Sequence, residues 1–385
     1  MTADTGQSRP SALAEPASAP AATTRRTTKP VVAWAIVGSL WTALTIYCWG
    51  AWLLLGHAKP SPIGPTPVPR WQVVSAWSWQ IFFVISWLVA VYLLFWRPWR
   101  RDGKIGFDGI FSLAWFMLWA LQDPWANYTV QQFNYSSVVL NLGCPQCHAP
   151  GWQSPGAANM AEPLLMSPGM YMAFFVGFCV MANRLMTRAQ QRWPRMGNFG
   201  LIVIAIVFMI FWDTVAEIVW IRTGMYHMGG GIRAITLWHG HWYQMPINEN
   251  LMWGTTWGLI AALRYFKNDR GETLAERGLS KIEAGSLAKQ GLRFLALVGI
   301  MNTIMFLCFN MPHQWFSTHA DYFPAEVQER SYFTNGMCGL GTDYACPGPT
   351  VPISVGPDSG HATPDGRFVA PKGLPVAPPS MGADG

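Results

Sequence analysis

The stretch FGLIVIAIVFMIFWDTVAEIVWI, residues Phe199–Ile221, contains only two charged side chains, Asp213 and Glu217. An apolar run of about 20 residues is long enough to cross the hydrocarbon core of a bilayer as a helix. No water is available inside that core, so the backbone must satisfy its own hydrogen bonds, as a helix does. The stretch therefore predicts a transmembrane helix.

Six further apolar runs flank this one in a chain of 385 residues, of which 12% are charged and 51% hydrophobic. That balance is unlike a soluble enzyme. We expect an all-α polytopic membrane helical bundle of about seven transmembrane helices, a multi-pass integral protein of the cell membrane. The six further predicted spans are Val31–Leu55, Trp71–Trp96, Gly106–Leu121, Pro163–Arg184, Met245–Leu263 and Leu292–Met311.

Lysine and arginine collect in alternate loops of this pattern. Short cytoplasmic loops of membrane proteins accumulate positive charge. Basic residues precede the first span and follow the second, fourth and sixth, whereas the loop from Asp123 to Glu162 has none. The pattern predicts a cytoplasmic N-terminus and an outward C-terminus. Because the net charge of +6 is confined to these short loops, we do not expect a nucleic-acid partner.

Composition divides the chain into four parts. Residues 1–30 are rich in Ala, Pro, Thr and Ser and predict a disordered cytoplasmic tail without a cleavable signal, and residues 347–385, rich in Pro and Gly, predict a second disordered tail. Between them we expect a membrane domain, residues 31–312, and an extracytoplasmic segment, residues 313–346. Within the charged loop before the last span, Glu272–Gln290 fits either a short amphipathic helix on the inner membrane surface or a solvated connector.

Carboxyl groups inside or at the edge of spans cost roughly 2.5 to 3.5 kcal/mol on insertion scales, so each needs a reason. Asp213 and Glu217 are four residues apart and share one helix face. Two carboxyl groups so close in a medium of low polarity favour one protonated and one ionised form, which suits general acid–base catalysis. An interhelical hydrogen bond or a salt bridge from Glu217 to Arg222 or Arg233 is the structural alternative. The candidate catalytic residues are Asp213, Glu217, Asp123, Glu162 and Glu249.

A dense polar run, Gly224–Asn250, separates two apolar helices. Its histidines, with the nearby carboxylates, have the donor types of a metal site, but the run contains no familiar zinc signature such as H-E-x-x-H. We therefore predict no metal ligands. The polar aromatic residues and histidines of the run are Tyr226, His227, His239, His241 and Tyr243.

The outward loop contains Cys144-Pro145-Gln146-Cys147-His148, and C-x-x-C-H is the attachment motif of c-type haem. A local disulfide and free thiols are the alternatives for these two cysteines. Cys338 and Cys346, predicted on the same side, are candidates to pair with each other. We interpret Cys48, Cys179 and Cys308, which lie in spans, as packing residues.

Several short motifs along Val31–Lys281 resemble those of the AveC-like spirocyclase family. They combine charged loop residues with polar residues at span ends. The matching motifs are Arg97–Asp102 with Phe107-Asp108-Gly109, Gln122-Asp123-Pro124, Asn127-Tyr128, Asn134-Tyr135-Ser136, Pro150-Gly151-Trp152, Glu162-Pro163-Leu164-Leu165, Gly197-Asn198, Trp212-Asp213 with Glu217, Gly224-x-Tyr226, and Tyr243-Gln244-x-Pro246 with Glu249.

The resemblance implies a similar multi-pass fold and dehydrative cyclisation of a dihydroxy-ketone to a spiroketal, with no cofactor. That chemistry needs a proton donor, a base and a pocket that tolerates a cation, as the ring faces of Trp212 or Tyr243 would. We expect a hydrophobic small-molecule substrate, polyketide- or lipid-like, and contact with membrane lipid. A noncatalytic lipid-binding or transport-accessory protein is the alternative function. The candidate substrate-binding residues are Asn127, Tyr128, Tyr135, Trp212, Tyr226, His227 and Tyr243.

Overall fold

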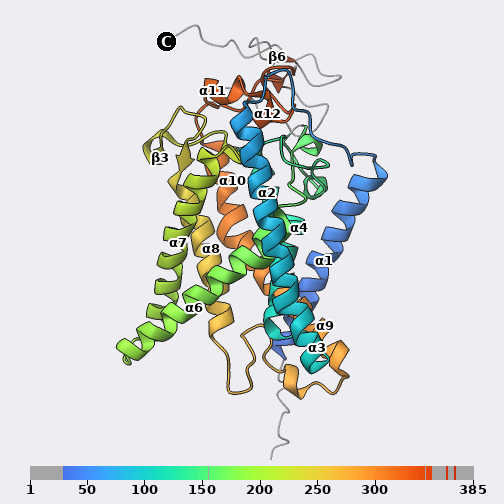
Figure 1. Cartoon of the computed structure of the whole chain (residues 1–385), viewed down its shortest axis with the longest axis vertical. Coiled ribbons are helices and arrows are strands. Elements are labelled where there is room, and N and C mark those ends of the chain that lie inside the picture. Colours follow the sequence, from blue (N-terminus) through green and yellow to red (C-terminus); the bar gives the residue numbers. More distant parts are fainter. Residues whose placement is uncertain (1–28, 155, 343, 349–360, 363–367, 370–385) are drawn as a thin grey trace, which may run out of the picture.

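The computed structural model describes residues 29–154, 156–342, 344–348, 361–362 and 368–369, and this part of the chain is mostly helical (Figure 1). Three long helices contain a π-helical turn. The long helical segments are α1 (Pro30–Leu54); α2 (Arg70–Ala90) with η1 (Val91–Trp96) and α3 (Arg97–Asp102); α4 (Phe107–Gln122); α5 (Ser167–Gly169) with η5 (Met170–Phe174) and α6 (Phe175–Arg192); α7 (Asn198–Arg222); α8 (Ile247–Tyr265); and α9 (Ser286–Met305) with η8 (Phe306–Asn310) and α10 (Met311–Thr318).

The remaining elements are short. The 3₁₀ turns are η2 (Asp123–Asn127), η3 (Gln146–His148), η4 (Ala157–Asn159), η6 (Arg233–Ile235) and η7 (Leu279–Lys281), and the last helices are α11 (Ala325–Gln328) and α12 (Ser331–Thr334). Three antiparallel pairs join β1 (Phe133–Tyr135) to β2 (Tyr226–Met228), β3 (Thr236–Leu237) to β4 (Met245–Pro246), and β5 (His361–Ala362) to β6 (Phe368–Val369).

Five of the helical segments are long and apolar enough to cross a membrane. Their outward side chains include exposed Leu40, Ile85 and Val207, as expected for helices whose solvent is lipid. These helices indicate an integral membrane protein. The five candidate spans are Pro30–Leu54, Arg70–Asp102, Ser167–Arg192, Asn198–Arg222 and Ser286–Thr318.

The other two predicted spans correspond to α4 and α8, which lie inside the bundle. α4 is only 16 residues long, and most of its side chains are buried. α8 packs closely against α7, because a Cβ added at Gly254 or Gly258 would stand 2.6 Å from a Cα atom of α7. Small residues permit such close approach of membrane helices. The seven helices expected from the sequence are all present, and five of them have the length and hydropathy of a membrane span.

Several helix ends differ from the predicted ones. The fourth segment begins at Ser167 rather than Pro163 and continues to Arg192, and the last runs from Ser286 to Thr318. Both helices continue beyond the apolar run into residues with polar side chains, such as Arg188 and Gln314. Apolarity alone therefore underestimates their length.

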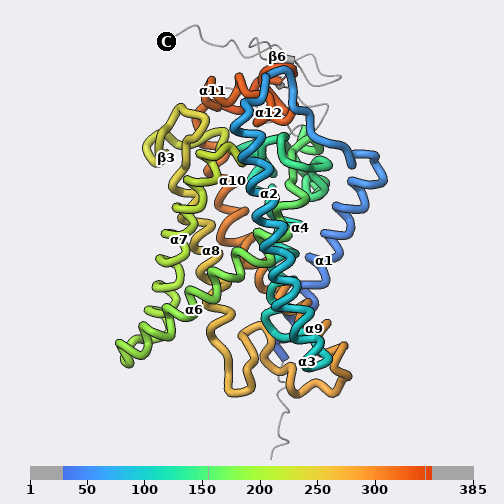
Figure 2. Tube along the Cα trace, in the orientation of Figure 1, coloured from blue at the N-terminus to red at the C-terminus, as the bar shows by residue number. Residues whose placement is uncertain are grey.

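The two outward loops of the predicted topology lie at the same end of the bundle. β1 in the loop after α4 pairs with β2 in the loop after α7, with Tyr135 opposite Tyr226. α3 and the loop between α8 and α9 lie at the other end (Figure 2). Cys338 and Cys346 form a disulfide, as proposed from the sequence. The two predicted disordered tails lie largely outside the described residues. In the C-terminal tail, the structure describes residues 347–348 and the short strands β5 and β6.

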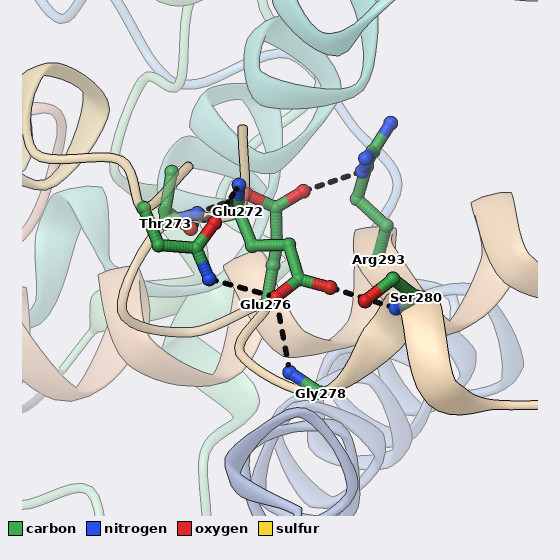
Figure 3. Close-up of polar contacts among 7 residues, drawn as sticks. Glu272, Thr273, Glu276, Gly278, Ser280 and Arg293 are labelled. Carbon is green, nitrogen blue, oxygen red and sulfur yellow. Dashed lines mark hydrogen bonds and ion pairs between the residues drawn. The ribbon is translucent and has the colours of Figure 1, made fainter. Parts of the chain in front are cut away.

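The loop between α8 and α9 is folded rather than helical. The amphipathic helix considered over Glu272–Gln290 is wrong: only the turn η7 forms before α9 begins at Ser286. The Glu272 carboxylate accepts hydrogen bonds from the backbone N–H groups of Ser280 and Gly278, at 2.7 and 3.2 Å. These bonds close the chain into turns and so compete with a helix. Nor is the loop a simple solvated connector, because Glu272 is buried and its carboxylate is held by these bonds within the loop (Figure 3).

Candidate active site

Asp213 and Glu217 lie on the buried face of α7, one helical turn apart, as predicted. The amide Nδ2 of Asn250, on α8, donates a hydrogen bond of 3.3 Å to Asp213. Asp213 thus makes the interhelical bond considered as its structural alternative. Arg222 makes no salt bridge to Glu217 among the described residues, because its guanidinium lies 3.8 Å from the ring centre of Tyr243.

A buried cavity brings together three of the five candidate carboxyl groups, those of Asp123, Glu217 and Glu249. Its volume is about 50 Å³, enough for a few water molecules, since each needs about 10–15 Å³. Among the described residues that line it, none is a lysine or arginine. The rest of the lining is mainly aromatic and methionine: Ala126, Phe133, Tyr135, Met170, Tyr171, Phe175, Trp220, Met225, Tyr226, Met228, Trp253, Met305, Phe309 and His313.

Asp123 lies just beyond the end of α4, at the first position of η2. The hydroxyl of Tyr171 donates a hydrogen bond to its Oδ1 atom. Burial raises the pKa of Asp123 to about 6, although hydrogen bonds from Tyr171 and Tyr135 act in the opposite direction. The carboxyl group can therefore gain or lose a proton near neutral pH.

Glu162 is fully buried beside this cavity without lining it. Its Oε2 atom accepts a hydrogen bond of 3.1 Å from the indole of Trp119. Burial and, after it, the nearby charge of Asp123 raise the pKa of Glu162 well above its ordinary value. Such a group favours the protonated form and can serve as a proton reserve for Asp123.

Two tyrosines from the paired strands β1 and β2 face the carboxyl groups. The ring centres of Tyr135 and Tyr226 are 5.8 Å apart. Burial is the main cause that raises both pKa values well above their ordinary value; the next largest is the charge of Asp123 for Tyr135 and that of Glu217 for Tyr226. The strand pairing therefore holds two neutral hydroxyl groups over the acids.

Each of the five candidate carboxyl groups has one buried oxygen without a hydrogen-bond partner among the described residues. An unsatisfied buried polar atom costs about 1–3 kcal/mol, and more if it is charged. Such atoms need an explanation, and a bound ligand or water would satisfy them. The unpartnered atoms are Oδ2 of Asp123, Oε1 of Glu162, Oδ1 of Asp213, and Oε2 of Glu217 and Glu249.

Of the seven candidate substrate-binding residues, only Tyr135 and Tyr226 line the cavity. Asn127 instead shapes its own loop, because its Oδ1 accepts the backbone N–H groups of Gln132 and Phe133 at 2.6 and 2.8 Å. The hydroxyl of Tyr128 donates to the backbone carbonyl of Pro150, in the same loop.

The other three candidates also lie elsewhere. Trp212 packs on Phe178, at the outer surface of the bundle. His227 is fully buried, which lowers its pKa to about 4, and its Nε2 lies 3.1 Å from the carbonyl oxygen of Phe333. Tyr243 stacks on His241 outside the cavity.

Two polar residues of the cavity, Tyr171 and His313, were not predicted. Both lie within apolar helical segments, and His313 is buried. The sequence offered little signal for His313, because the last span was predicted to end at Met311 and the helix continues to Thr318. For Tyr171 the sequence offered none, because tyrosine is common at membrane interfaces.

The histidines and cysteines considered for a metal or haem site have other partners. The described residues contain no cluster of three or more His, Cys, Asp or Glu positioned to hold a metal ion. His239 pairs with Asp321 and His241 with Glu326, at 3.1 and 3.2 Å. Cys144 and Cys147 form a local disulfide, one of the alternatives considered for this loop.

The apolar helices and the acidic cavity together define a polytopic membrane protein with a buried carboxyl site. The family model described as Spirocyclase AveC-like matches residues 99–333, more than half of the chain. The protein therefore belongs to the AveC-like spirocyclase family. The match begins later than the resemblance in the sequence and extends through the last long helix to α12. No curated protein matches the chain, and no solved structure matches it.

Proposed function

We propose that this protein is a membrane cyclase that closes a hydrophobic oxygenated substrate by acid–base dehydration in the carboxyl cavity. The observation that carries the proposal is the convergence of three carboxyl groups on one cavity with no lysine or arginine in its described lining. Carboxyl groups without a basic partner favour a state in which at least one is protonated. A protonated acid and a carboxylate base can then stand on opposite sides of a substrate.

Glu217 is the proposed acid and Asp123 the proposed base. The hydroxyl of Tyr171 donates to Asp123, which favours the ionised form of that carboxyl group. Glu217 has an unpartnered oxygen and faces the neutral hydroxyl of Tyr226. Glu249, the third cavity carboxyl, is proposed to bind a substrate hydroxyl.

The proposed reaction begins from a hemiketal that carries a second hydroxyl group. Glu217 protonates the hemiketal hydroxyl, the carbon–oxygen bond breaks, and water leaves an oxocarbenium ion. The second hydroxyl attacks this carbon, and Asp123 removes its proton. The product is a spiroketal plus one water molecule, and return of the proton from Asp123 to Glu217 through Tyr135 and Tyr226 completes the cycle.

The aromatic walls support the cationic intermediate. Trp220 and Trp253 line the same cavity as the acids. Aromatic faces attract cations by about 0.5–2 kcal/mol, more when water is excluded. The chemistry uses no cofactor.

The test is turnover of a long-chain dihydroxy-ketone whose hydroxyl groups can close two rings, followed by mass spectrometry as loss of one water. Glu217→Gln and Asp123→Asn should each lower the rate by about 10²–10⁴-fold, the usual contribution of a general acid or base. The matched control is Glu283→Gln, an exposed carboxylate of the α8–α9 loop, which should retain the wild-type rate. Full activity in both cavity variants would refute the assignment.

A wild-type protein that binds the dihydroxy-ketone and never converts it would favour the noncatalytic alternative, a lipid-binding or transport-accessory protein. In that case Glu217→Gln would change binding and no product would form with any variant. Binding and product are therefore measured in the same preparation.

The proposed setting is the cell membrane, with seven spans, an inward N-terminus and an outward C-terminus. The alternation of basic loops supports it, as does their separation from the β1–β2 end of the bundle. A reporter fused after Gly385 should be active outside the cytoplasm. A cytoplasmic signal from that fusion would overturn this topology.

A further inference from the structure

A second hollow lies on the outer surface of the bundle, between α2, the η5–α6 segment and α7. Its volume is about 510 Å³, within the range of about 300–1,000 Å³ that ligand sites occupy. Ser78 is the only polar residue of its described lining apart from tryptophan indoles, and no charged residue is included. We call this hollow the lateral groove.

The helices around the lateral groove determine what fills it. α2, α6 and α7 belong to three of the five candidate membrane spans. Their outward side chains next to the groove, such as Phe82 and Val219, are exposed and apolar. In a bilayer the medium at such a surface is hydrocarbon, so the groove is filled by an alkyl chain. Along α7 it extends from Trp212 to Trp220, a rise of about 12 Å.

One residue, Trp220, lines both the lateral groove and the carboxyl cavity. It follows Glu217 by three positions, so both side chains lie on the same side of α7. Its indole packs against Phe174 and Trp79, with ring centres 5.5 and 6.3 Å apart. The side chain of Trp220 therefore separates the lateral groove from the carboxyl cavity.

The η5 turn repeats this arrangement on the opposite side. Met170 and Tyr171 line the cavity, whereas Phe174, in the same π-helical turn, lines the groove. π-Helical turns interrupt regular helix packing and are frequent at functional sites. Both α7 and the η5 turn therefore contribute side chains to the lateral groove and neighbouring side chains to the carboxyl cavity.

The carboxyl cavity alone is too small for a whole long-chain substrate. At about 50 Å³ it accepts the oxygenated centre of a substrate at most, and the groove beside it is ten times larger. We propose that the lateral groove binds the alkyl chain of a membrane-dissolved substrate, and that the oxygenated end passes Trp220 to reach the carboxyl cavity. This inference rests on the proposed cyclase function and assigns its substrate to the amphiphiles dissolved in the bilayer.

The test uses a substitution that fills the lateral groove at a residue that does not line the carboxyl cavity. Ala216 lines the groove only, and Ala216→Trp would occupy it. In phosphatidylcholine vesicles this variant should lower turnover of a long-chain dihydroxy-ketone by at least about tenfold, because several methylene groups lose their binding surface. A short-chain, water-soluble dihydroxy-ketone should be converted at the wild-type rate. Val207→Trp is the matched control, since Val207 is on α7, 60% exposed and outside the groove.

Ala216→Leu gives a milder filling for the case in which Ala216→Trp does not fold. A second readout needs no turnover: a fatty alcohol carrying a diazirine is irradiated with the protein in vesicles, and the labelled peptides are identified. Labelling should concentrate on the groove segments of α2, α6 and α7 and decrease in Ala216→Trp. Equal labelling of all outward helices, or no change in the variant, would overturn the groove.

The two proposals fail in different ways. If neither ketone is converted but the photolabel marks the groove, the cyclase proposal is wrong and the alkyl-chain site stands. If both ketones are converted equally well by Ala216→Trp and the wild type, the cyclase proposal stands and the lateral route is wrong.

Discussion

Buried carboxyl groups gather in two regions of this protein, and their hydrogen bonding differs. In the α8–α9 loop, the Glu276 carboxylate forms an ion pair with Arg293 and accepts the Thr273 hydroxyl at 2.6 Å (Figure 3). In the carboxyl cavity, no lysine or arginine is among the described lining residues, so Glu217 and Glu249 have no such counterion there. Carboxylates paired with a cation stabilise a fold, whereas buried ones without a cation cost stability and are kept for binding or chemistry. The contrast separates structural from functional acids.

The largest stability effect should come from the loop. Glu276→Gln removes the counterion of Arg293, and breaking a buried pair typically costs about 3–5 kcal/mol. We expect about 3 kcal/mol, the lower end, because Arg293 is 26% exposed. Thermal unfolding in detergent measures this, with Glu283→Gln as the unaffected control. An unchanged unfolding midpoint would mean that the loop carboxylates are not structural.

The pH dependence of turnover should report the protonation of Asp123 in the carboxyl cavity. Because Asp123 has a pKa raised to about 6 and acts as the base, its ionised form is lost as the pH falls below that value. The rate should then decrease about tenfold, or 1.4 kcal/mol, per pH unit below about 6. Asp123→Asn should have a low rate without this acidic limb. A limb that persists in the variant would assign it to another group.

A glutamate-to-glutamine substitution in the carboxyl cavity should change the free energy of unfolding much less than Glu276→Gln does, or should increase it. Glu217→Gln removes a buried carboxyl group that has an unpartnered oxygen, so the free energy of unfolding should stay within about 1 kcal/mol of the wild type or rise. Turnover and unfolding are measured on the same preparation. A loss comparable to that of Glu276→Gln would make Glu217 a structural residue.

The smallest effect concerns Glu272. Burial alone would raise its pKa, but hydrogen bonds from Ser280, Asn268 and Gly278 outweigh burial and lower it to about 2. A depressed carboxyl pKa gives stability that is complete above the unfolded value near 4.5 and is lost as the pH falls toward 2. Between pH 7 and pH 4 the loss should be under about 1 kcal/mol. Glu272→Gln should remove this part of the pH slope; an identical slope would contradict it.

The cavity shows which of the candidate residues the fold brings together. Asp123, Glu217 and Glu249 were selected because ionisable groups at span ends are costly, and that cost is a property of each residue in lipid. Tyr135 and Tyr226 were selected with them. Trp212 and Tyr243 were proposed from the family resemblance and their ring chemistry, and the fold places them outside the cavity. Residue type indicates chemistry, but not the direction in which a side chain points.

The sequence by itself located the helices, although some of them end beyond the apolar run, as at Arg192 and Thr318. It also determined the one face of α7 that carries Asp213 and Glu217. Local physics suffices for these, because a helix in lipid must satisfy its backbone internally and its period is fixed. Only the tertiary structure decided the rest. It brought Asp123, Glu217 and Glu249 to one cavity, added Tyr171 and His313, folded Glu272 into turns, and set Trp220 between the acids and the lipid. These contacts join residues far apart in the chain, so they depend on helix packing, which the local sequence does not encode.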